Sequence, residues 1–181
     1  SGAIEFIPEE DMKRQFDVNL IGTINTVKAV LPYMRKENAG RIICISSLSA
    51  IYSIPFQAYY SASKAAINSF VDALNNEVKP FNISAVAVMP GDIATGFTAN
   101  RQKTVAGSDV YTLANSAVAK MEEDEKNGMS PDEVAKLVVK LADKKKVAPI
   151  YSVGLSYKFL VFIKRLFPNS FASKIIGNMY K

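Results

Sequence analysis

Two short segments that are apolar at nearly every position, residues 41–45 and 83–88, constrain the fold of this chain most strongly. A strand that is apolar on both faces has to be covered on both faces, which is typical of buried parallel strands. Residues 147–152 predict a third short strand. Helical patterns of apolar residues occupy the segments around these strands, at residues 8–31, 60–78, 111–126 and 131–143. This alternation predicts an α/β fold with a parallel sheet and helices on both of its faces.

The sequence also predicts where several of these elements begin and end. The first helix should kink or end near Pro32, because proline removes a backbone donor and clashes with the preceding turn. Ser130, Pro131 and Glu133 form a capping-box pattern that should start the last of the four helices. Residues 92–109 show no periodicity, and we expect a long loop there.

The composition excludes several kinds of chemistry. The 181 residues include no histidine and one cysteine, so the chain can build neither a His-dependent catalytic triad nor a zinc cage, and we expect no metal site. The single cysteine, Cys44, cannot form an internal disulfide, which favours a reducing, cytoplasmic location. Its place in an apolar strand is typical of a small buried hydrophobic residue.

The charge distribution does not point to nucleic acid or to a membrane span. The net charge is +5, but the basic residues are scattered except at 144–146, whereas a nucleic-acid surface needs a concentrated stripe. The longest uncharged stretch, residues 42–63, carries six serines, a glutamine and a proline, which excludes a transmembrane helix there. The length predicts a single domain.

One pair of residues within a predicted helix could carry acid–base chemistry. Tyr60 and Lys64 stand four residues apart, which places them on one helix face. A nearby cation favours the phenolate, and it would lower the tyrosine pKa from about 10 toward the range of a general acid or base. Such a pair also arises by chance, and a partly exposed helix pair is the alternative interpretation.

Polar and turn-forming residues follow the first two predicted strands. Ser46 and Ser47 end the first strand, and Pro90 and Gly91 end the second. In an open α/β sheet, ligands bind at the carboxyl ends of the strands. The helix that begins near Tyr60 follows the first strand and can reach the same edge. The three features therefore predict one shared crevice.

With these motifs the chain resembles the short-chain dehydrogenase/reductase family over roughly residues 5–152. The matching segments are Asn19-Leu-Ile-Gly22, Ser46-Ser47, Tyr60-Ser-Ala-Ser-Lys64 thirteen residues beyond Ser47, and Pro90-Gly91-Asp-Ile-Ala-Thr95. The resemblance implies a Rossmann-like, doubly wound parallel sheet, of which this chain holds the C-terminal two-thirds. It also implies that residues 1–152 are part of one such domain and that residues 153–181 are an apolar and basic helical tail of it.

The resemblance assigns a role to each matching residue. Tyr60 would exchange a proton with the substrate oxygen, Lys64 would lower its pKa and bind the nicotinamide ribose, and Ser47 would hold the substrate oxygen. Asn19 would support a water-linked proton relay; the alternative is a polar residue that bends its helix. The expected cofactor is NAD or NADP, with its nicotinamide end held by Tyr60 and Lys64 and lined by Pro90, Gly91, Ile93 and Thr95.

One departure from the family pattern concerns the phosphates of the cofactor. No two glycines stand two residues apart, so residues 1–181 contain no Gly-x-Gly phosphate-binding turn. The resemblance places that glycine-rich segment before this chain, and we expect residues 1–181 alone neither to bind a dinucleotide tightly nor to turn over substrate. Two readings remain: part of an oxidoreductase that interconverts an alcohol and a carbonyl on an apolar small molecule, or a truncated, non-catalytic association module.

The pattern of residues 154–181 and the two long helices indicate which surfaces could contact a membrane or a second copy of the chain. Residues 154–181 carry a broad apolar helix face with Lys158, Lys164 and Arg165 beside it. Such a helix could pack over the substrate mouth or a partner subunit, or lie on a membrane surface. The resemblance implies a homodimer or homotetramer through the two long helices, where small residues would permit close approach: Ala62, Ala66 and Ala73.

Overall fold

The computed structural model describes residues 1–180 and contains three parallel strands in the order β1-β2-β3. Strand β1 spans Gly40–Ile45, β2 spans Ile83–Met89 and β3 spans Ile150–Ser152. The predicted α/β fold with a parallel sheet is confirmed. The third strand is shorter than its apolar segment, because it begins at Ile150 rather than at residue 147.

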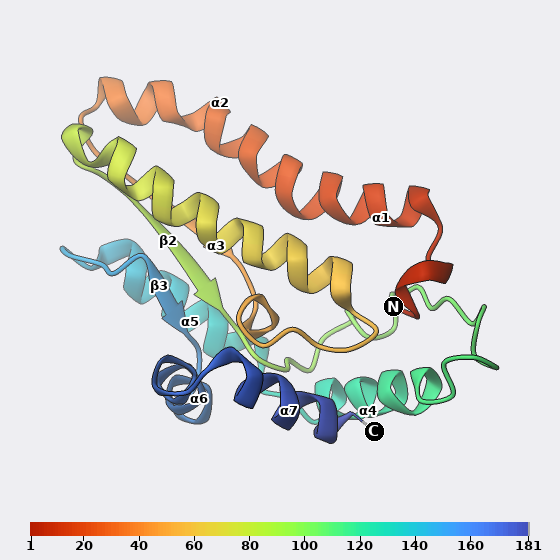
Figure 1. Ribbon diagram of the computed structural model, residues 1–181. Helices are drawn as coiled ribbons and strands as arrows, with labels where there is room; N and C mark the ends of the chain where they lie inside the picture. Colours follow the sequence, from red (N-terminus) through yellow and green to blue (C-terminus); the bar gives the residue numbers. More distant parts are fainter. Residues whose placement is uncertain (181) are drawn as a thin grey trace.

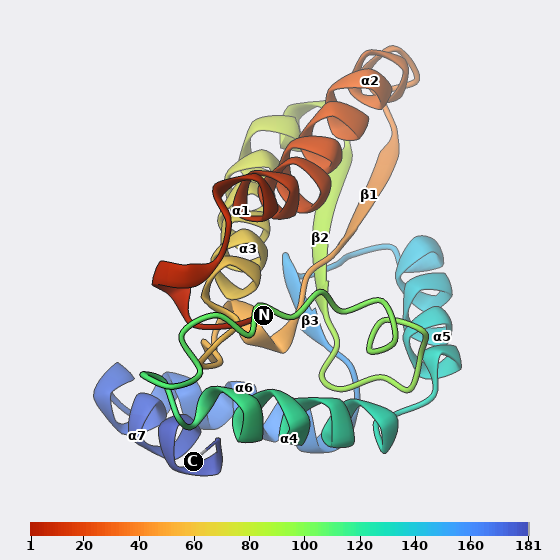
Figure 2. The ribbon, with the colours of Figure 1, turned by 90° about the vertical axis from the view of Figure 1, so that its right-hand side faces the viewer.

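One face of the sheet is covered by two long helices, α2 (Gly22–Lys36) and α3 (Ala58–Val78). Figure 2 shows both helices on the same side of β1 and β2. Cys44 of β1 and Ala87 of β2 lie opposite each other in the register, and both are buried beneath these helices. The helices contribute most of the remaining buried residues of this core: Val27, Ile67, Val71, Leu74 and Val78.

The other face of the sheet is covered by α5 (Pro131–Asp143). Val86 and Val88 of β2 are fully buried there against Leu141. The Arg41 guanidinium donates to the carbonyl oxygens of Leu141 (2.7 Å) and Lys144 (2.8 Å), so it satisfies backbone acceptors at the C-terminal end of α5. Because neighbouring residues of β2 are buried on opposite faces, the strand is apolar at consecutive positions.

The first predicted helix is one continuous helical segment with a local change of pitch. Helix α1 (Glu9–Phe16) runs through a π-helical turn, η2 (Asp17–Ile21), into α2. The helix does not stop at Pro32 itself, but Pro32 lies in its last turn, as predicted, because α2 ends four residues later at Lys36. Proline costs this helix one hydrogen bond, to the carbonyl of Lys28. Lys28 is exposed, so water can satisfy that carbonyl.

The predicted capping box at the start of α5 would have two hydrogen bonds, one formed by the Ser130 side chain and one by the Glu133 side chain. One of the two is confirmed. The Ser130 hydroxyl accepts a hydrogen bond from the Asp132 backbone N–H at 3.2 Å. The Glu133 side chain does not return to the cap; it forms an ion pair with Lys136 at 2.9 Å. The long loop is confirmed as well, because residues 90–113 contain no helix or strand.

Three helices form a layer across the carboxyl ends of the strands: α4 (Ala114–Lys126), α6 (Leu155–Leu166) and α7 (Asn169–Met179). Figures 1 and 2 show this layer below the sheet, with α4 and α7 near each other. The predicted tail is thus two helices rather than one. Short 3-10 helices complete the described elements: η1 (Ile4–Phe6), η3 (Leu48–Ala50) and η4 (Lys79–Phe81).

Candidate active site

A cavity of about 460 Å³ lies at the carboxyl ends of β1 and β2. Its inner wall consists of the segments that follow the two strands and the first turns of α3, and α6 and α7 form its outer wall. The structure brings all the residues predicted from the sequence into this one cavity: Asn19, Ser47, Tyr60 and Lys64, together with Pro90, Gly91, Ile93 and Thr95. The predicted crevice is therefore present.

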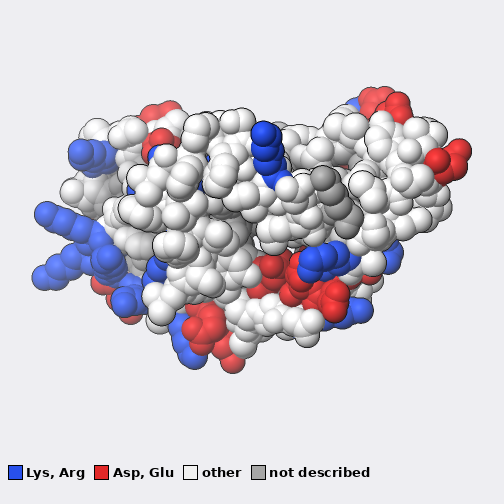
Figure 3. All heavy atoms as spheres, turned by 60° about the horizontal axis from the view of Figure 1, so that its bottom comes forward, with Lys and Arg blue, Asp and Glu red and all other residues white. Residues whose placement is uncertain are grey.

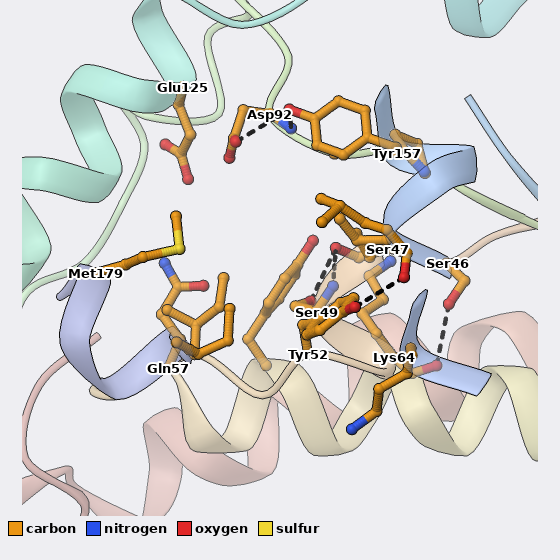
Figure 4. Close-up of a pocket in the computed structure, with 18 of the residues that line it drawn as sticks. Ser46, Ser47, Ser49, Tyr52, Gln57, Lys64, Asp92, Glu125, Tyr157 and Met179 are labelled. Carbon is orange, nitrogen blue, oxygen red and sulfur yellow. Dashed lines mark hydrogen bonds between the residues drawn. The ribbon is translucent and has the colours of Figure 1, made fainter. Parts of the chain in front are cut away.

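The hydroxyl of Ser47 is held by its neighbour Ser49. The Ser49 hydroxyl donates to Ser47 Oγ at 2.8 Å, and the Ser49 backbone N–H donates to the same oxygen at 3.1 Å (Figure 4). A hydroxyl that accepts two hydrogen bonds keeps its own proton free to donate. Ser46 is anchored separately, by donating to the carbonyl of Lys64 at 3.1 Å. This contact ties the end of β1 to α3.

Burial has the largest effect on the pKa of the Tyr60 phenol. It raises the pKa of Tyr60 above its usual value, a hydrogen bond with Ser47 acts in the opposite direction, and the charge of Glu125 adds to the rise. The ring packs against Phe97, with centroids 5.8 Å apart. Because its pKa is raised, the phenol is protonated at neutral pH. In this state it can donate a proton but cannot accept one.

The lowering of the Tyr60 pKa by Lys64 stays a prediction, because the net change in the free chain is a rise caused mainly by burial. Lys64 Nζ donates to the backbone carbonyl of Ile45 at 2.9 Å and lies 5.8 Å from the centroid of the Tyr60 ring. Burial lowers the pKa of Lys64. The sequence places the two residues on one helix face, but burial of the phenol dominates over the ammonium in the free chain.

Asn19 lies in the π-helical turn of the first helical segment. Its side-chain N–H donates to the Ser63 hydroxyl at 3.0 Å, and that hydroxyl donates to the Tyr60 carbonyl at 2.8 Å. Ser63 is fully buried. A π turn inserted into an α-helix is frequently found at functional sites. The turn and these two hydrogen bonds connect the asparagine to the helix that carries the tyrosine.

The segment that follows β2 is fixed next to Ser47. The Leu48 backbone N–H donates to the Pro90 carbonyl at 2.8 Å, so the ends of β1 and β2 are joined beyond the sheet. Gly91 packs directly against the Tyr157 ring, where a Cβ atom would overlap the ring. Ile93 pairs with Met129 in an isolated bridge. Thr95 is exposed at the rim.

The outer wall of the cavity is apolar. Helices α6 and α7 and the turn between them line it mainly with aliphatic and aromatic side chains, together with the charged Lys164; the apolar ones include Leu160, Ile163, Phe167, Phe171, Ile175, Ile176 and Met179. The Tyr52 hydroxyl donates to the Leu160 carbonyl at 2.8 Å, which attaches α6 to the segment after β1. Figure 3 shows that much of this side of the molecule is uncharged. The wall therefore favours an apolar ligand.

Comparisons with known proteins identify the family. A family model described as short chain dehydrogenase matches residues 1–106, more than half of the chain. The chain belongs to the short chain dehydrogenase family. The 3-ketodihydrosphingosine reductase of Bacteroides thetaiotaomicron is 39% identical over 161 residues, which cover 84% of this chain and 60% of that protein. The chain thus spans about 60% of the length of this curated relative.

Solved structures of this family share the fold. A 3-oxoacyl-[acyl-carrier protein] reductase from Brucella melitensis with bound NAD has a TM-score of 0.64 and 26% identity, over 86% of this chain and 54% of that one. A short chain dehydrogenase from Burkholderia cenocepacia in complex with NADP has a TM-score of 0.63 and 23% identity, over 90% and 60%. The three-stranded parallel sheet is thus Rossmann-like.

Sequence reasoning missed several residues of this short chain dehydrogenase site. Ser49 was not singled out because several serines stand near it in the sequence. Its position two residues after Ser47 would have predicted a local hydrogen bond between the two residues. Asp92, which lines the cavity, stands inside the Pro90–Thr95 motif and was read only as part of it. Tyr157, whose hydroxyl donates to Asp92 Oδ2 at 3.2 Å, comes from a distant helix and had no sequence signal.

Proposed function

We propose that the complete protein carrying this chain is an NAD- or NADP-dependent oxidoreductase that interconverts an alcohol and a carbonyl on an apolar small molecule. The observation that carries this proposal is the meeting of Ser47, Tyr60 and Lys64 in one cavity with an apolar outer wall. The name of the 39% identical relative, a reductase of a keto compound, agrees with it.

The residues of the inner wall suit the nicotinamide end of the cofactor. Lys64 and Tyr60 offer an ammonium and a hydroxyl as hydrogen-bond donors, and the turn from Pro90 to Thr95 lines the same cavity. When bound, the dinucleotide supplies or accepts the hydride. Residues 1–181 contain no Gly-x-Gly turn for its phosphates, so this part of the chain does not distinguish NAD from NADP.

Ser47 and Tyr60 would handle the substrate oxygen. The free proton of Ser47 can be donated to that oxygen and so stabilise the negative charge that develops during carbonyl reduction. Tyr60, kept protonated by burial, would then donate its proton to the same oxygen. Oxidation of the alcohol needs the phenolate instead. We therefore expect the rate of oxidation to rise with pH as Tyr60 loses its proton.

Asn19 would act on this reaction through Tyr60 rather than on the substrate directly. Its hydrogen bond to Ser63, and that of Ser63 to the Tyr60 carbonyl, support a role in positioning the tyrosine and in a water-linked proton relay. The π turn places the asparagine amide at the cavity without ending the helix.

A turnover assay separates this proposal from the alternative, a non-catalytic association module. The complete protein is mixed with NADH or NADPH and with dodecan-2-one, and the fall in nicotinamide absorbance is followed. We expect saturable oxidation of at least one dinucleotide that depends on the ketone. Absence of turnover with aliphatic and aromatic ketones, and with the matching alcohols and oxidised dinucleotides, would favour the association module.

We further propose that the outward face of α6 contacts a membrane surface. Four apolar residues on this helix are strongly exposed, namely Leu155 (83%), Phe159 (62%), Phe162 (56%) and Leu166 (61%). Exposed Lys158 and Arg165 on the same helix would favour anionic headgroups. Within the described residues, no helix is both long and apolar enough to cross a bilayer. The test is co-sedimentation with phosphatidylglycerol vesicles, which Phe159→Ser together with Phe162→Ser should abolish.

We also propose that two copies associate through α2 and α3. Ala62 and Ala73 are exposed on the α3 surface and would let a partner helix approach closely. Ala73→Arg should shift the complete protein toward the monomer in sedimentation, because it places a long charged side chain in that contact. Ala135→Arg, on the exposed surface of α5 across the sheet, is the matched control. An unchanged sedimentation coefficient in both variants would exclude this interface.

A further inference from the structure

The Asp92 carboxylate is a charged group of the cavity that the proposed reaction does not use. Its Oδ2 atom accepts a hydrogen bond from the Tyr157 hydroxyl, and the carboxylate also has a hydrogen bond with its own backbone N–H, but no basic group forms an ion pair with it within residues 1–180. Figure 4 shows the carboxylate between Glu125 and Tyr157 at the edge of the cavity. An ionised group in an apolar cavity is costly unless a partner of opposite charge accompanies it.

The other charged side chains that line the cavity have partners. Lys64 donates to a backbone carbonyl, and Lys164 Nζ lies 5.5 Å from the centroid of the Tyr52 ring. Glu125 forms an ion pair with Arg101 and accepts a hydrogen bond from Thr98 at 2.7 Å. Of the two acidic groups among these four, Glu125 has an ion pair and Asp92 has none within the described part of the chain.

The electrostatic surroundings of Asp92 are acidic rather than basic. Burial raises the pKa of this carboxyl, and the charges of Asp124 and Glu125 raise it further. The basic side chain that interacts with Asp92 is the exposed Lys120, whose pKa is raised mainly by its hydrogen bond with Asp124 and to a smaller extent by the charge of Asp92. The ion pair of Lys120 is with Asp124, at 3.0 Å, rather than with Asp92. A cationic group brought into the cavity would stabilise the ionised carboxylate, whereas an anionic group would be repelled.

Asp92 is also close to the reacting groups. The Pro90 carbonyl is hydrogen-bonded to the backbone of Leu48, the residue after Ser47. Asp92 follows Pro90 by two residues, which span at most about 7 Å of extended chain. Its charge also raises the pKa of Tyr60. In a substrate whose cationic group binds Asp92, only a few bonds would therefore separate that group from the oxygen that Ser47 and Tyr60 would hold.

We propose that the substrate is an amphipathic amino alcohol or amino ketone, whose protonated amine binds Asp92 while its apolar chain lies along α6 and α7. This inference rests on the proposed function, because it places the amine relative to the reacting oxygen. The Tyr157 hydroxyl, which donates to one carboxylate oxygen, leaves the other for the ammonium group. Asp92 thus determines specificity and takes no part in proton transfer.

The test compares two alcohols that differ only in the amine, dodecan-2-ol and 1-aminododecan-2-ol. Their oxidation with NAD or NADP is measured in the complete protein near neutral pH, for wild type, Asp92→Asn and Asp124→Asn. Asparagine keeps an acceptor oxygen for Tyr157 but removes the charge. Asp124 is a matched control, since it is a nearby acid that does not line the cavity. Calorimetric titration of both alcohols gives a readout that needs no turnover.

We expect the ratio of kcat/KM for the amino alcohol to that for the plain alcohol to fall roughly 10- to 100-fold in Asp92→Asn, the range of one hydrogen bond to a charged group. Asp124→Asn should leave the ratio unchanged. The inference is overturned if wild type does not prefer the amino alcohol in turnover or binding, or if Asp92→Asn keeps the preference. Amine-selective binding that Asp92→Asn abolishes, without turnover of either alcohol, would uphold this inference and reject the proposed function.

Discussion

The inner and outer walls of the cavity are built in different ways. Ser46 and Ser49 of the inner wall are almost inaccessible to solvent, with 3% of each exposed, and so is Ser63 (0%) behind Tyr60. Each of the three serines makes hydrogen bonds within the fold. On the outer wall, Phe171 (45%) and Met179 (50%) remain half exposed, and Phe171 stacks on Phe167. Hydrogen bonds fix position, whereas apolar contacts adapt to shape. The inner wall therefore suits chemistry, and the outer wall suits selection of the substrate.

The largest effect should come from the inner wall. Tyr60→Phe removes the phenolic proton, so kcat of the complete protein should fall about 100- to 10,000-fold, the usual contribution of a general acid or base. Tyr59→Phe is the matched control, since the Tyr59 hydroxyl makes only a long, 3.5 Å contact with the Ile4 carbonyl. Equal losses in the two variants, or more than a tenth of the activity left in Tyr60→Phe, would contradict this division of roles.

A smaller effect should come from the outer wall and appear in KM. Ile163 on α6 lines the cavity, whereas its neighbour Phe162 points to solvent with 56% of its surface exposed. Ile163→Ala removes apolar contact at roughly 0.8 kcal/mol per buried methylene, so KM for dodecan-2-one should rise about 5- to 30-fold. Phe162→Ala should leave KM unchanged. If Ile163→Ala lowered kcat and left KM unchanged, α6 would take part in the chemistry that is assigned here to the inner wall.

The support of Ser47 by Ser49 should matter less than Tyr60 itself. Ser49→Ala removes the 2.8 Å hydrogen bond but keeps the backbone one, so kcat should fall about 2- to 10-fold, the range of one neutral hydrogen bond. A positioning role lowers kcat and leaves KM nearly constant. Steady-state kinetics with dodecan-2-one distinguishes this outcome from a general loss of structure, which circular dichroism would report.

The smallest effect concerns stability and pH. The folded-state pKa of Asp92 is raised above its ordinary value of 3.8, so the folded state favours the protonated form. Stability from this group is present at low pH and is lost as pH rises through the raised pKa. Asp92→Asn should therefore raise the melting temperature of the substrate-free protein at neutral pH, and the gain should vanish below pH 3.8. A gain that persists in acid would contradict this explanation.

The inner wall could be predicted from the sequence because its signals are local. Two segments that are apolar at nearly every position predict β1 and β2. The residues directly after each strand have to lie at the carboxyl edge of the sheet. Tyr60 and Lys64 then follow from the spacing within α3. Asn19 could be placed only through the resemblance to the family, because nothing in its own segment indicates a π turn.

What could not be predicted depends on contacts between distant parts of the chain. Tyr157 and Asp92 are 65 residues apart, and their hydrogen bond arises only when α6 folds over the turn after β2. The net direction of the Tyr60 pKa could not be predicted either, because burial, which spacing does not show, has the largest effect on it. Pro32 shows the limit of a local rule: it lies in the last turn of α2, but the exact end of the helix, at Lys36, could not be read from the proline alone.

The most direct test of the central claim follows the hydride itself. The complete protein is incubated with dodecan-2-one and with NADH or NADPH that carries deuterium at both hydrogens of the nicotinamide C4, and the alcohol is analysed by mass spectrometry. We predict one deuterium at the carbinol carbon, and none in the Tyr60→Phe variant beyond its residual turnover. An alcohol formed without deuterium, or no alcohol with either dinucleotide, would contradict the assignment of this cavity to hydride transfer.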